Sequence, residues 1–231
     1  MSATAIHILF DTLAWLTSLT TIFILRRTWF PKQPVTKPLR VGYIIALIFG
    51  AGVGAWLFGT ANLWLSGVYQ FGRSIEGALA GAIVAIEIYK KLNGITARTG
   101  AIYALPMTLG IAVGRIGCLL SGLKDFTYGI PTGAAWGWDF GDGILRHPVQ
   151  LYETIAMLAF ATLYAIMIKR GSISWRTNGF YYAVAFYAIE RFILEFFKPY
   201  GSLVANLTIF QLLSIGLLGY AVLMMRGEKT Q

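Results

Sequence analysis

Seven segments of about twenty mostly apolar residues constrain the fold of this chain more than any other feature. They cover residues 5–25, 40–59, 74–92, 101–121, 148–169, 178–197 and 205–225. A helix needs about 20 such residues to cross the hydrocarbon core of a bilayer, which is roughly 30 Å thick. Only 13% of the 231 residues are charged, against roughly 25% in a soluble domain. The sequence therefore predicts an all-α, polytopic membrane protein that forms a single domain over residues 1–231.

Basic residues are distributed unevenly over the connections between these segments. Thirteen lie on one side of the predicted membrane: Arg26, Arg27, Lys32, Lys37, Arg40, Lys90, Lys91, Arg98, Lys169, Arg170, Arg176, Arg226 and Lys229. Four lie on the other side: Arg73, Lys124, Arg146 and Lys198. Because loops rich in lysine and arginine stay in the cytoplasm, we expect the N-terminus outside and the C-terminus inside. The net charge of +9 then reflects orientation, and we expect no nucleic-acid partner.

The connections differ in length and composition. Most are short, which predicts that helices adjacent in the sequence are antiparallel partners. Residues 122–147 are the exception, since this stretch is rich in glycine and aromatic residues and too polar to cross a membrane. Long loops are more often functional than accidental, and the predicted orientation places this one outside. The small residues of G-A-G-V-G at 50–54 and G-A-L-A-G at 77–81 predict close helix approach.

Most of the ionisable groups inside the segments share one depth. They are His7, Asp11, Glu76, Arg115, His147, Glu153, Glu190, Arg191 and Glu195. Such groups are costly in a bilayer and mark functional sites by default. A transporter or a receptor on the same scaffold would spread polar groups through the whole depth. One site at the level of the outer headgroups is therefore favoured. Glu87, near the other end, is expected to pair with Lys90 or Lys91.

The stretch R-H-P-V-Q-L-Y-E at 146–153 places several polar groups at the entrance of the fifth segment. Proline is tolerated in the first turn of a helix, so Pro148 makes His147 the cap-region residue. Gln150 and Glu153 follow three and six residues after His147 and fall on the same helix face. We expect this face to point into the bundle. Glu153 is predicted to pair with the arginines there, and Glu153→Gln is predicted to cost less activity than loss of either arginine.

Several of these motifs together resemble those of the phosphatidylglycerol–prolipoprotein diacylglyceryl transferase family. They are G-R-I-G at 114–117 with its glycine-rich continuation, R-H-P-V-Q-L-Y-E, E-R-F-I-L-E-F-F-K-P at 190–199 and F-Q-L-L-S at 210–214. The resemblance implies a bacterial inner-membrane enzyme that moves a diacylglyceryl group from phosphatidylglycerol to the lipobox cysteine of a prolipoprotein. Glycerol phosphate leaves. We expect no cofactor and no metal, and the single cysteine excludes a multi-cysteine metal site.

The resemblance also implies roles for individual residues. Arg115 and Arg191 fall on the family's two essential arginines, and both are expected to bind the phosphate of the lipid. Glu195 falls on the acid one turn later; this residue and Glu153 are expected to orient the arginines. His147 and Glu76 are the candidate bases for the incoming thiol. The implied substrate-binding residues are Arg146, Gln150, Tyr152, Glu153, Asp125, Gly114, Gly117, Gly122 and Gly129.

The chain departs from the family pattern at four positions. Cys118 stands where the family has asparagine, Leu123 (with Asp125 nearby) where it has glutamate, Glu76 where it has histidine, and Val53 where it has arginine. These departures leave a different acceptor open, with the same donor. Two more hypotheses stay open at this point: a covalent role for Cys118, and a seven-helix transporter or receptor without catalysis.

Overall fold

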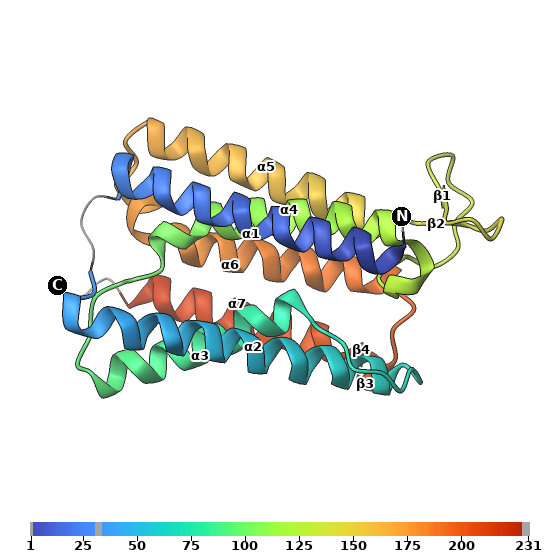
Figure 1. Ribbon diagram of the computed structural model, residues 1–231, viewed down its shortest axis with the longest axis horizontal. Helices are drawn as coiled ribbons and strands as arrows, with labels where there is room; N and C mark the ends of the chain where they lie inside the picture. The colour runs from blue at the N-terminus through green and yellow to red at the C-terminus, as the bar shows by residue number, and fades with distance from the viewer. Residues whose placement is uncertain (1, 31–33, 228–231) are drawn as a thin grey trace.

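The computed structural model describes residues 2–30 and 34–227, and within them the chain is mostly helical (Figure 1). Its long helices are α1 (Ala3–Thr28), α2 (Arg40–Leu65), α3 (Ile75–Leu92), α4 (Ala104–Ser121), α5 (Val149–Lys169), α6 (Ile173–Leu194) and α7 (Ile209–Arg226). Each overlaps one predicted segment, so the all-α class is confirmed. Within these residues, five of the helices (α1, α2, α4, α5 and α7) are long and apolar enough to cross a membrane. Helices α3 and α6 are not among these five; α3 carries four charged residues, Glu76, Glu87, Lys90 and Lys91.

Short elements connect the helices. Two 3₁₀ turns, η1 (Lys37–Leu39) and η2 (Ala101–Tyr103), precede α2 and α4, while η3 (Gly122–Asp125) and η4 (Glu195–Phe197) follow α4 and α6. Strands β1 (Trp138–Asp139) and β2 (Leu145–Arg146) form one antiparallel hairpin, and β3 (Ser202–Val204) and β4 (Leu207–Thr208) form another. The sequence did not predict these hairpins.

Polar residues set the starts of several helices. The Ser74 side chain accepts a hydrogen bond from the backbone of Gly77 at the start of α3. A reciprocal capping box between Thr208 and Gln211 starts α7. The predicted start of the last segment at residue 205 is wrong, because Ala205 and Asn206 adopt positive φ. That backbone conformation turns the second hairpin and cannot continue a helix.

The predicted start of the sixth segment, in contrast, is too late. Helix α6 starts at Ile173 rather than 178, because polar residues at a helix end are still compatible with helical hydrogen bonding. The Thr177 hydroxyl donates to the Ile173 carbonyl at 3.0 Å, one turn earlier. The guanidinium of Arg176 reaches the Trp29 carbonyl at the end of α1.

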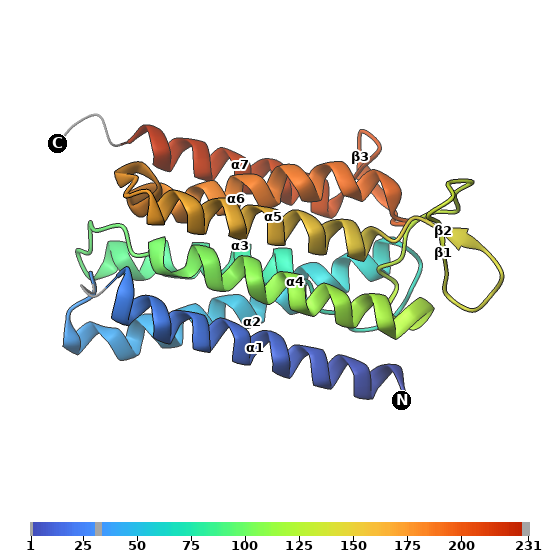
Figure 2. The same ribbon diagram turned by 90° about the horizontal axis from the view of Figure 1, so that it is seen from above.

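The helices form two layers (Figures 1 and 2). One layer contains α1, α4, α5 and α6, the other contains α2, α3 and α7, and the layers are joined along α6 and α7. The expectation that adjacent helices are partners holds for α2–α3, α4–α5, α5–α6 and α6–α7. It is wrong for α1–α2 and α3–α4, since α1 packs on α4 and α3 on α7. The eleven-residue connections 29–39 and 93–103 allow this, because a chain of that length can span up to roughly 36–40 Å.

A cavity of about 720 Å³ separates α1 and α4 from α2 and α3. Its lining is mostly apolar and includes Ile22, Leu47, Leu79, Ile83 and Ile111. The cavity exists because the helices on its two sides are not partners. Its volume and apolar walls suit a hydrocarbon chain.

Helices α2 and α3 approach each other through glycine, as the small-residue stretches predict. A Cβ atom added to Gly54 would collide with the backbone carbonyl of Gly77, and one added to Gly81 would collide with that of Gly50. Neither backbone can move without separating the helices. Close approach of these two helices is therefore confirmed.

We expect Gly54→Ala to destabilise the protein, because overpacking of this kind costs about 1–3 kcal/mol. The midpoint of thermal unfolding in detergent measures the effect. Gly52→Ala is the matched control, since a Cβ atom there meets nothing within 4 Å. Equal midpoints for the two variants would show that the close contact between α2 and α3 is not needed for stability.

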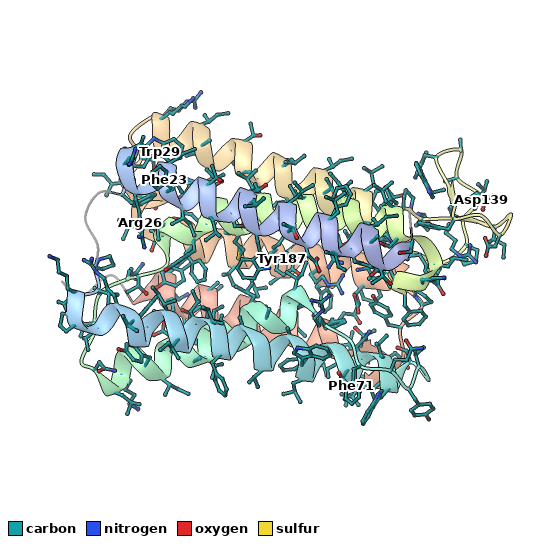
Figure 3. All side chains as sticks on the ribbon, in the orientation of Figure 1. Phe23, Arg26, Trp29, Phe71, Asp139 and Tyr187 are labelled. Atoms are coloured by element: carbon teal, nitrogen blue, oxygen red, sulfur yellow. The ribbon has the colours of Figure 1, made fainter. Side chains whose placement is uncertain are left out.

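The two ends of the bundle differ in composition. Figure 3 shows Asp139 in the first hairpin beyond one end, Arg26 and Trp29 at the other, and Tyr187 inside the bundle. Residues 122–147 lie at the end where α1 and α7 begin (Figure 1). The two lysines Lys32 and Lys229 of the basic side lie outside the described residues.

Candidate active site

Five side chains from five elements meet inside the bundle near the hairpin end. Glu76 comes from α3, Arg115 from α4, Glu153 from α5, Arg191 from α6 and Glu195 from η4. None of these residues is more than 5% exposed. The structure therefore brings together both arginines and three of the acids that the sequence singled out. We call this set the arginine–carboxylate cluster.

Arg191 is the centre of this cluster. Its Nε lies 3.2 Å from Oε2 of Glu76, its Nη1 lies 2.6 Å from Oε1 of Glu153, and its Nη2 lies 3.1 Å from Oε2 of Glu195. The predicted pairs with Glu153 and Glu195 are confirmed. Because each guanidinium nitrogen already has a carboxylate partner, Arg191 holds three acids from three elements in fixed positions.

Arg115 is bound differently. Its Nε lies 2.8 Å from Oε2 of Glu153, and among the described residues this is its one acidic partner. Its Nη1 donates only a weak hydrogen bond, 4.0 Å long, to the Cys118 sulfur. A guanidinium binds phosphate through two parallel N–H groups, and the terminal nitrogens of Arg115 are not occupied by carboxylates. Arg115 is thus the better placed of the two arginines to bind an anion.

Lys198 balances the negative charge of the arginine–carboxylate cluster. Because it follows the sixth predicted segment, its position in the sequence predicts an exposed loop residue and not a site residue. Its side chain is fully buried, with Nζ 3.0 Å from Oε1 of Glu153. Three cations thus face the three carboxylates of the cluster. Buried charges persist only when they are paired, which explains this arrangement. The motif E-R-F-I-L-E-F-F-K-P, which ends just after Lys198, was the signal that could have found it.

Helix α7 supports the carboxylates from its first turns. The Ser214 hydroxyl donates to Oε1 of Glu76 at 2.6 Å. The Thr208 hydroxyl donates to Oε1 of Glu195 at 3.0 Å. Gln211 caps α7 and its Nε2 donates to the Phe192 carbonyl. The F-Q-L-L-S motif therefore orients the acids rather than contributing charge.

Some buried polar atoms near the cluster have no hydrogen-bond partner among the described residues. Apart from atoms that take part in the ion pairs above, they are the Tyr187 hydroxyl, Oε1 of Gln150 and both carboxylate oxygens of Glu190. Tyr187 is fully buried and lies one turn before Arg191 on α6. Buried polar groups are nearly always satisfied, so these atoms mark places where a polar ligand group can bind. Tyr187 precedes Arg191 by four residues, and this spacing alone could have placed it on the same helix face as Arg191.

The entrance motif divides into an inner and an outer part. Gln150 and Glu153 are fully buried, which confirms that their face points into the bundle. Nε2 of Gln150 donates to the Thr127 hydroxyl of the long loop at 3.2 Å. His147 and Tyr152 lie further out, with Nδ1 of His147 3.3 Å from the Tyr152 hydroxyl.

Aromatic side chains surround this outer part. The indole of Trp136 donates to the Tyr152 hydroxyl at 2.9 Å. The ring of Phe197 lies 4.9 Å from that of His147. His147 therefore sits in an aromatic layer that links the long loop to the end of α6.

Arg146 is held within the hairpin. Its two terminal nitrogens each lie 2.7 Å from a carboxylate oxygen of Asp142. Its guanidinium also lies over the Tyr128 ring, at 5.3 Å. The hydrogen bonds from Arg146 hold the pKa of the Asp142 carboxyl below its usual range. Arg146 therefore orders the loop and has no acidic partner in the arginine–carboxylate cluster.

The four glycines implied as site residues differ in what they contact. A Cβ atom at Gly129 would collide with the His147 backbone, and one at Gly117 with the Phe10 side chain. Gly122 has a φ of +70° and turns the chain out of α4. Of these four glycines, Gly114 is the one that lines the apolar cavity, and a Cβ atom added there would meet nothing within 4 Å.

Two further acids pair away from the cluster. Asp125 lies 2.7 Å from Nε2 of His7 and accepts a hydrogen bond from Thr127. Asp11, one turn after His7, lies 3.3 Å from Arg73 instead. At the opposite end, the predicted pair of Glu87 and Lys90 is confirmed, at 3.1 Å.

The fold and the site together define a class of protein. It is a multi-pass membrane protein with a buried arginine–carboxylate cluster near one end of its bundle and an apolar cavity beside it. A sequence model of the prolipoprotein diacylglyceryl transferase family matches residues 8–226. The chain belongs to this family.

Curated relatives carry the name phosphatidylglycerol–prolipoprotein diacylglyceryl transferase. The protein of Geobacter sulfurreducens is 34% identical over 67% of this chain, and the match covers 61% of that relative. The protein of Wolbachia pipientis subsp. Culex pipiens is 30% identical over 82% of this chain and 77% of its own length. That of Idiomarina loihiensis is 27% identical over 88% and 83%. The chain thus spans a little less than two thirds of the first of these relatives.

Proposed function

We propose that this protein transfers the diacylglyceryl group of phosphatidylglycerol to the cysteine thiol of a prolipoprotein lipobox. The observation that carries the proposal is the contrast between two buried arginines. Arg191 is saturated by three carboxylates, whereas Arg115 keeps its terminal nitrogens free of carboxylates. The names of the curated relatives support the same donor and acceptor.

The transfer breaks one bond and forms another. The thiolate sulfur attacks the glyceryl carbon, a C–S bond forms, and the C–O bond to phosphate breaks. The electron pair leaves with glycerol phosphate, and the thiol proton passes to a base. Arg115 would bind the phosphate and stabilise its developing charge, which is worth more in a water-poor site than in water. Arg191, Glu76, Glu153 and Glu195 would position Arg115 rather than bind the phosphate themselves.

The acyl chains and the glycerol groups of the lipid would bind beside the cluster. The apolar cavity would take an acyl chain, because Ile111 and Gly114, one helical turn and one residue before Arg115, line its wall. Oε1 of Gln150 and the Tyr187 hydroxyl would bind the polar glycerol groups. Arg146 and Tyr152 would border the path by which the peptide enters, and Asp125 would lie beside it.

His147 is the better of the two candidate bases. Glu76 already interacts with Arg191 and Ser214, so taking a proton would break an ion pair. Among the described residues, the His147 ring has one hydrogen-bond partner, Tyr152. It also lies at the outer layer, where a peptide would arrive.

If His147 is the base, His147→Gln should lose activity at neutral pH and regain part of it as the pH rises. A thiol with an unperturbed pKa of about 8.5 is mostly protonated at neutral pH and ionises unaided above that value. The ratio of variant to parent rates across the pH range measures this. A ratio that does not change with pH removes His147 as the base and leaves Glu76.

We also propose that all seven helices cross the bacterial inner membrane, with the N-terminus outside and the cluster at the outer leaflet. The thirteen basic residues on the opposite side support this orientation.

Cysteine labelling in intact cells tests the orientation. In a Cys118→Ala background, a cysteine at the exposed Ala135 of the long loop should react with a membrane-impermeant maleimide. A cysteine at the exposed Lys91 should react only after the cells are permeabilised. The reverse pattern would invert the proposed topology.

Complementation tests the activity in cells. We expect the gene to restore lipidation of a reporter lipoprotein in a bacterium depleted of its own diacylglyceryl transferase. An Arg115→Lys variant expressed at the same level is the negative control. Stable expression without any lipidated reporter would count against a prolipoprotein as the acceptor.

A further inference from the structure

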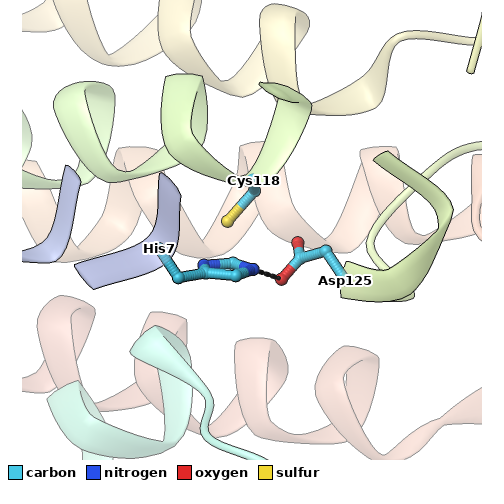
Figure 4. Close-up of side chains that lie close together, drawn as sticks. All are labelled: His7, Cys118 and Asp125. Atoms are coloured by element: carbon cyan, nitrogen blue, oxygen red, sulfur yellow. Dashed lines mark ion pairs between the residues drawn. The ribbon is translucent and has the colours of Figure 1, made fainter. Parts of the chain in front are cut away.

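Three metal-ligating side chains meet next to the arginine–carboxylate cluster. They are His7 from α1, Cys118 from α4 and Asp125 from η3, and Figure 4 shows them facing one another. Nε2 of His7 lies 2.7 Å from Oδ1 of Asp125. The imidazole nitrogen, the sulfur and the carboxylate oxygen all lie within 4.8 Å of one another. The fold thus brings together one nitrogen, one sulfur and one oxygen donor from separate segments.

The arrangement differs from that of a nucleophilic cysteine. In a Cys–His–Asp triad the imidazole lies between the sulfur and the carboxylate, with one nitrogen facing each. Here Nε2 of His7 is already bound to Asp125, and the Cys118 side chain points toward that pair (Figure 4). The donor atoms therefore converge on one point instead of forming a relay, as expected of ligands for a common ion.

The chemical nature of the three donor atoms indicates which metal ion they would bind. Thiolate and imidazole ligands favour zinc over magnesium or calcium, which prefer oxygen alone. Zinc binds sulfur at about 2.3 Å and nitrogen or oxygen at about 2.0–2.2 Å, so its tetrahedral ligands lie about 3–4 Å apart. The three donors reach such positions with small side-chain adjustments. Three protein ligands leave a fourth position for water.

Charge and access also fit a divalent cation. A Cys118 thiolate and the Asp125 carboxylate together offset the charge of Zn²⁺, and nearby Arg115 is already paired with Glu153. The side chains of His7 and Asp125 are 28% and 12% exposed. The ion can therefore enter from the hairpin end of the bundle.

We propose that His7, Cys118 and Asp125 form a Zn²⁺ site that ties α1 to α4 and η3. The site also touches the arginine–carboxylate cluster, because Nη1 of Arg115 lies 4.0 Å from the Cys118 sulfur. A metal-bound thiolate is a stronger acceptor than a thiol, so bound zinc would help to orient the Arg115 guanidinium. Metal binding itself does not depend on the proposed transfer reaction.

Cobalt titration tests the site directly. Cys118 is the one cysteine in the sequence, so a thiolate-to-cobalt charge-transfer band can come from no other residue. We expect the purified full chain, without a histidine tag, to bind one equivalent of Co²⁺ with such a band and to release it to Zn²⁺. Cys118→Ser should abolish the band. His7→Asn and Asp125→Asn should each weaken binding at least tenfold.

Asp11→Asn is the matched control, since Asp11 lies one turn from His7 and pairs with Arg73 instead. It should bind cobalt as the parent does. Folded parent protein that shows no thiolate band and retains no zinc would overturn the proposal, whatever the variants do. Unchanged affinity in both His7→Asn and Asp125→Asn would reduce the site to an adventitious thiol contact and overturn it equally.

Discussion

Replacing Arg115 with lysine is expected to reduce diacylglyceryl transfer by about 10²–10³-fold, the usual effect of removing a donor that stabilises transition-state charge. Lysine keeps the positive charge but lacks the planar pair of N–H groups that matches a phosphate. The side chain is buried and has one carboxylate partner, so the substitution removes little besides the anion contact. The rate of glycerol phosphate release at saturating phosphatidylglycerol measures the effect.

Arg73→Lys is the matched control for this substitution. Arg73 has a side chain that is 62% exposed and pairs with Asp11, so its replacement should leave the rate unchanged. Arg191→Lys should also cripple the enzyme, but with a loss of stability, because lysine cannot contact three carboxylates at once. Near-normal activity of Arg115→Lys would show that Arg115 is structural and would remove the proposed phosphate site.

Replacing Glu153 with leucine is expected to destabilise the protein by about 3–5 kcal/mol, the cost of leaving buried charges without their partner. Glu153 is fully buried and pairs with Arg115, Arg191 and Lys198. Its removal leaves three cations with two carboxylates. The free energy of unfolding in detergent, or the thermal midpoint, measures the loss.

Glu153→Gln separates charge from shape at the same position. The amide can still accept hydrogen bonds from Arg191 and Lys198, so we expect a smaller loss of stability. Its activity per folded molecule should exceed that of either arginine variant. Glu87→Gln is the control, because Glu87 pairs with Lys90 at the other end and is 36% exposed. A Glu153→Leu protein as stable as the parent would contradict the paired-charge description of the cluster.

The sequence predicts the helices and most of the cluster for simple physical reasons. Long apolar segments can hardly form anything but helices in a bilayer. An ionisable residue inside such a segment is costly to bury, and pairing reduces that cost. Glu153, Arg191 and Glu195 therefore had to face inward and pair, and they do. Their order along the chain and their common depth were enough to place them together.

The packing order of the helices could not be predicted in the same way. Adjacency in the sequence favours adjacent packing, yet α1 packs on α4 rather than α2. What decides the outcome is the fit of small residues, such as Gly117 against Phe10, and this depends on three-dimensional shape. The apolar cavity results from this packing order, so it could not be predicted from the sequence either.

Contacts between segments far apart in the sequence could not be predicted either. His7 lies one turn before Asp11 on α1, yet it binds Asp125 of η3, while Asp11 pairs with Arg73. Lys198 lies just past the end of η4, where a lysine normally faces water. In the structure its side chain is buried and pairs with Glu153, which lies on a different helix. The spacing of residues along the chain does not predict contacts of this kind.

Incubation of the purified protein with headgroup-labelled phosphatidylglycerol and a synthetic lipobox peptide tests the proposed function most directly. We expect labelled glycerol phosphate and a peptide carrying one diacylglyceryl group, in equal amounts. Both products should be absent with a peptide whose cysteine is replaced by serine, and both should fall about 10²–10³-fold with the Arg115→Lys enzyme. Glycerol phosphate release that needs no lipobox peptide would point to another acceptor. Folded protein that forms neither product would contradict the proposed transferase function.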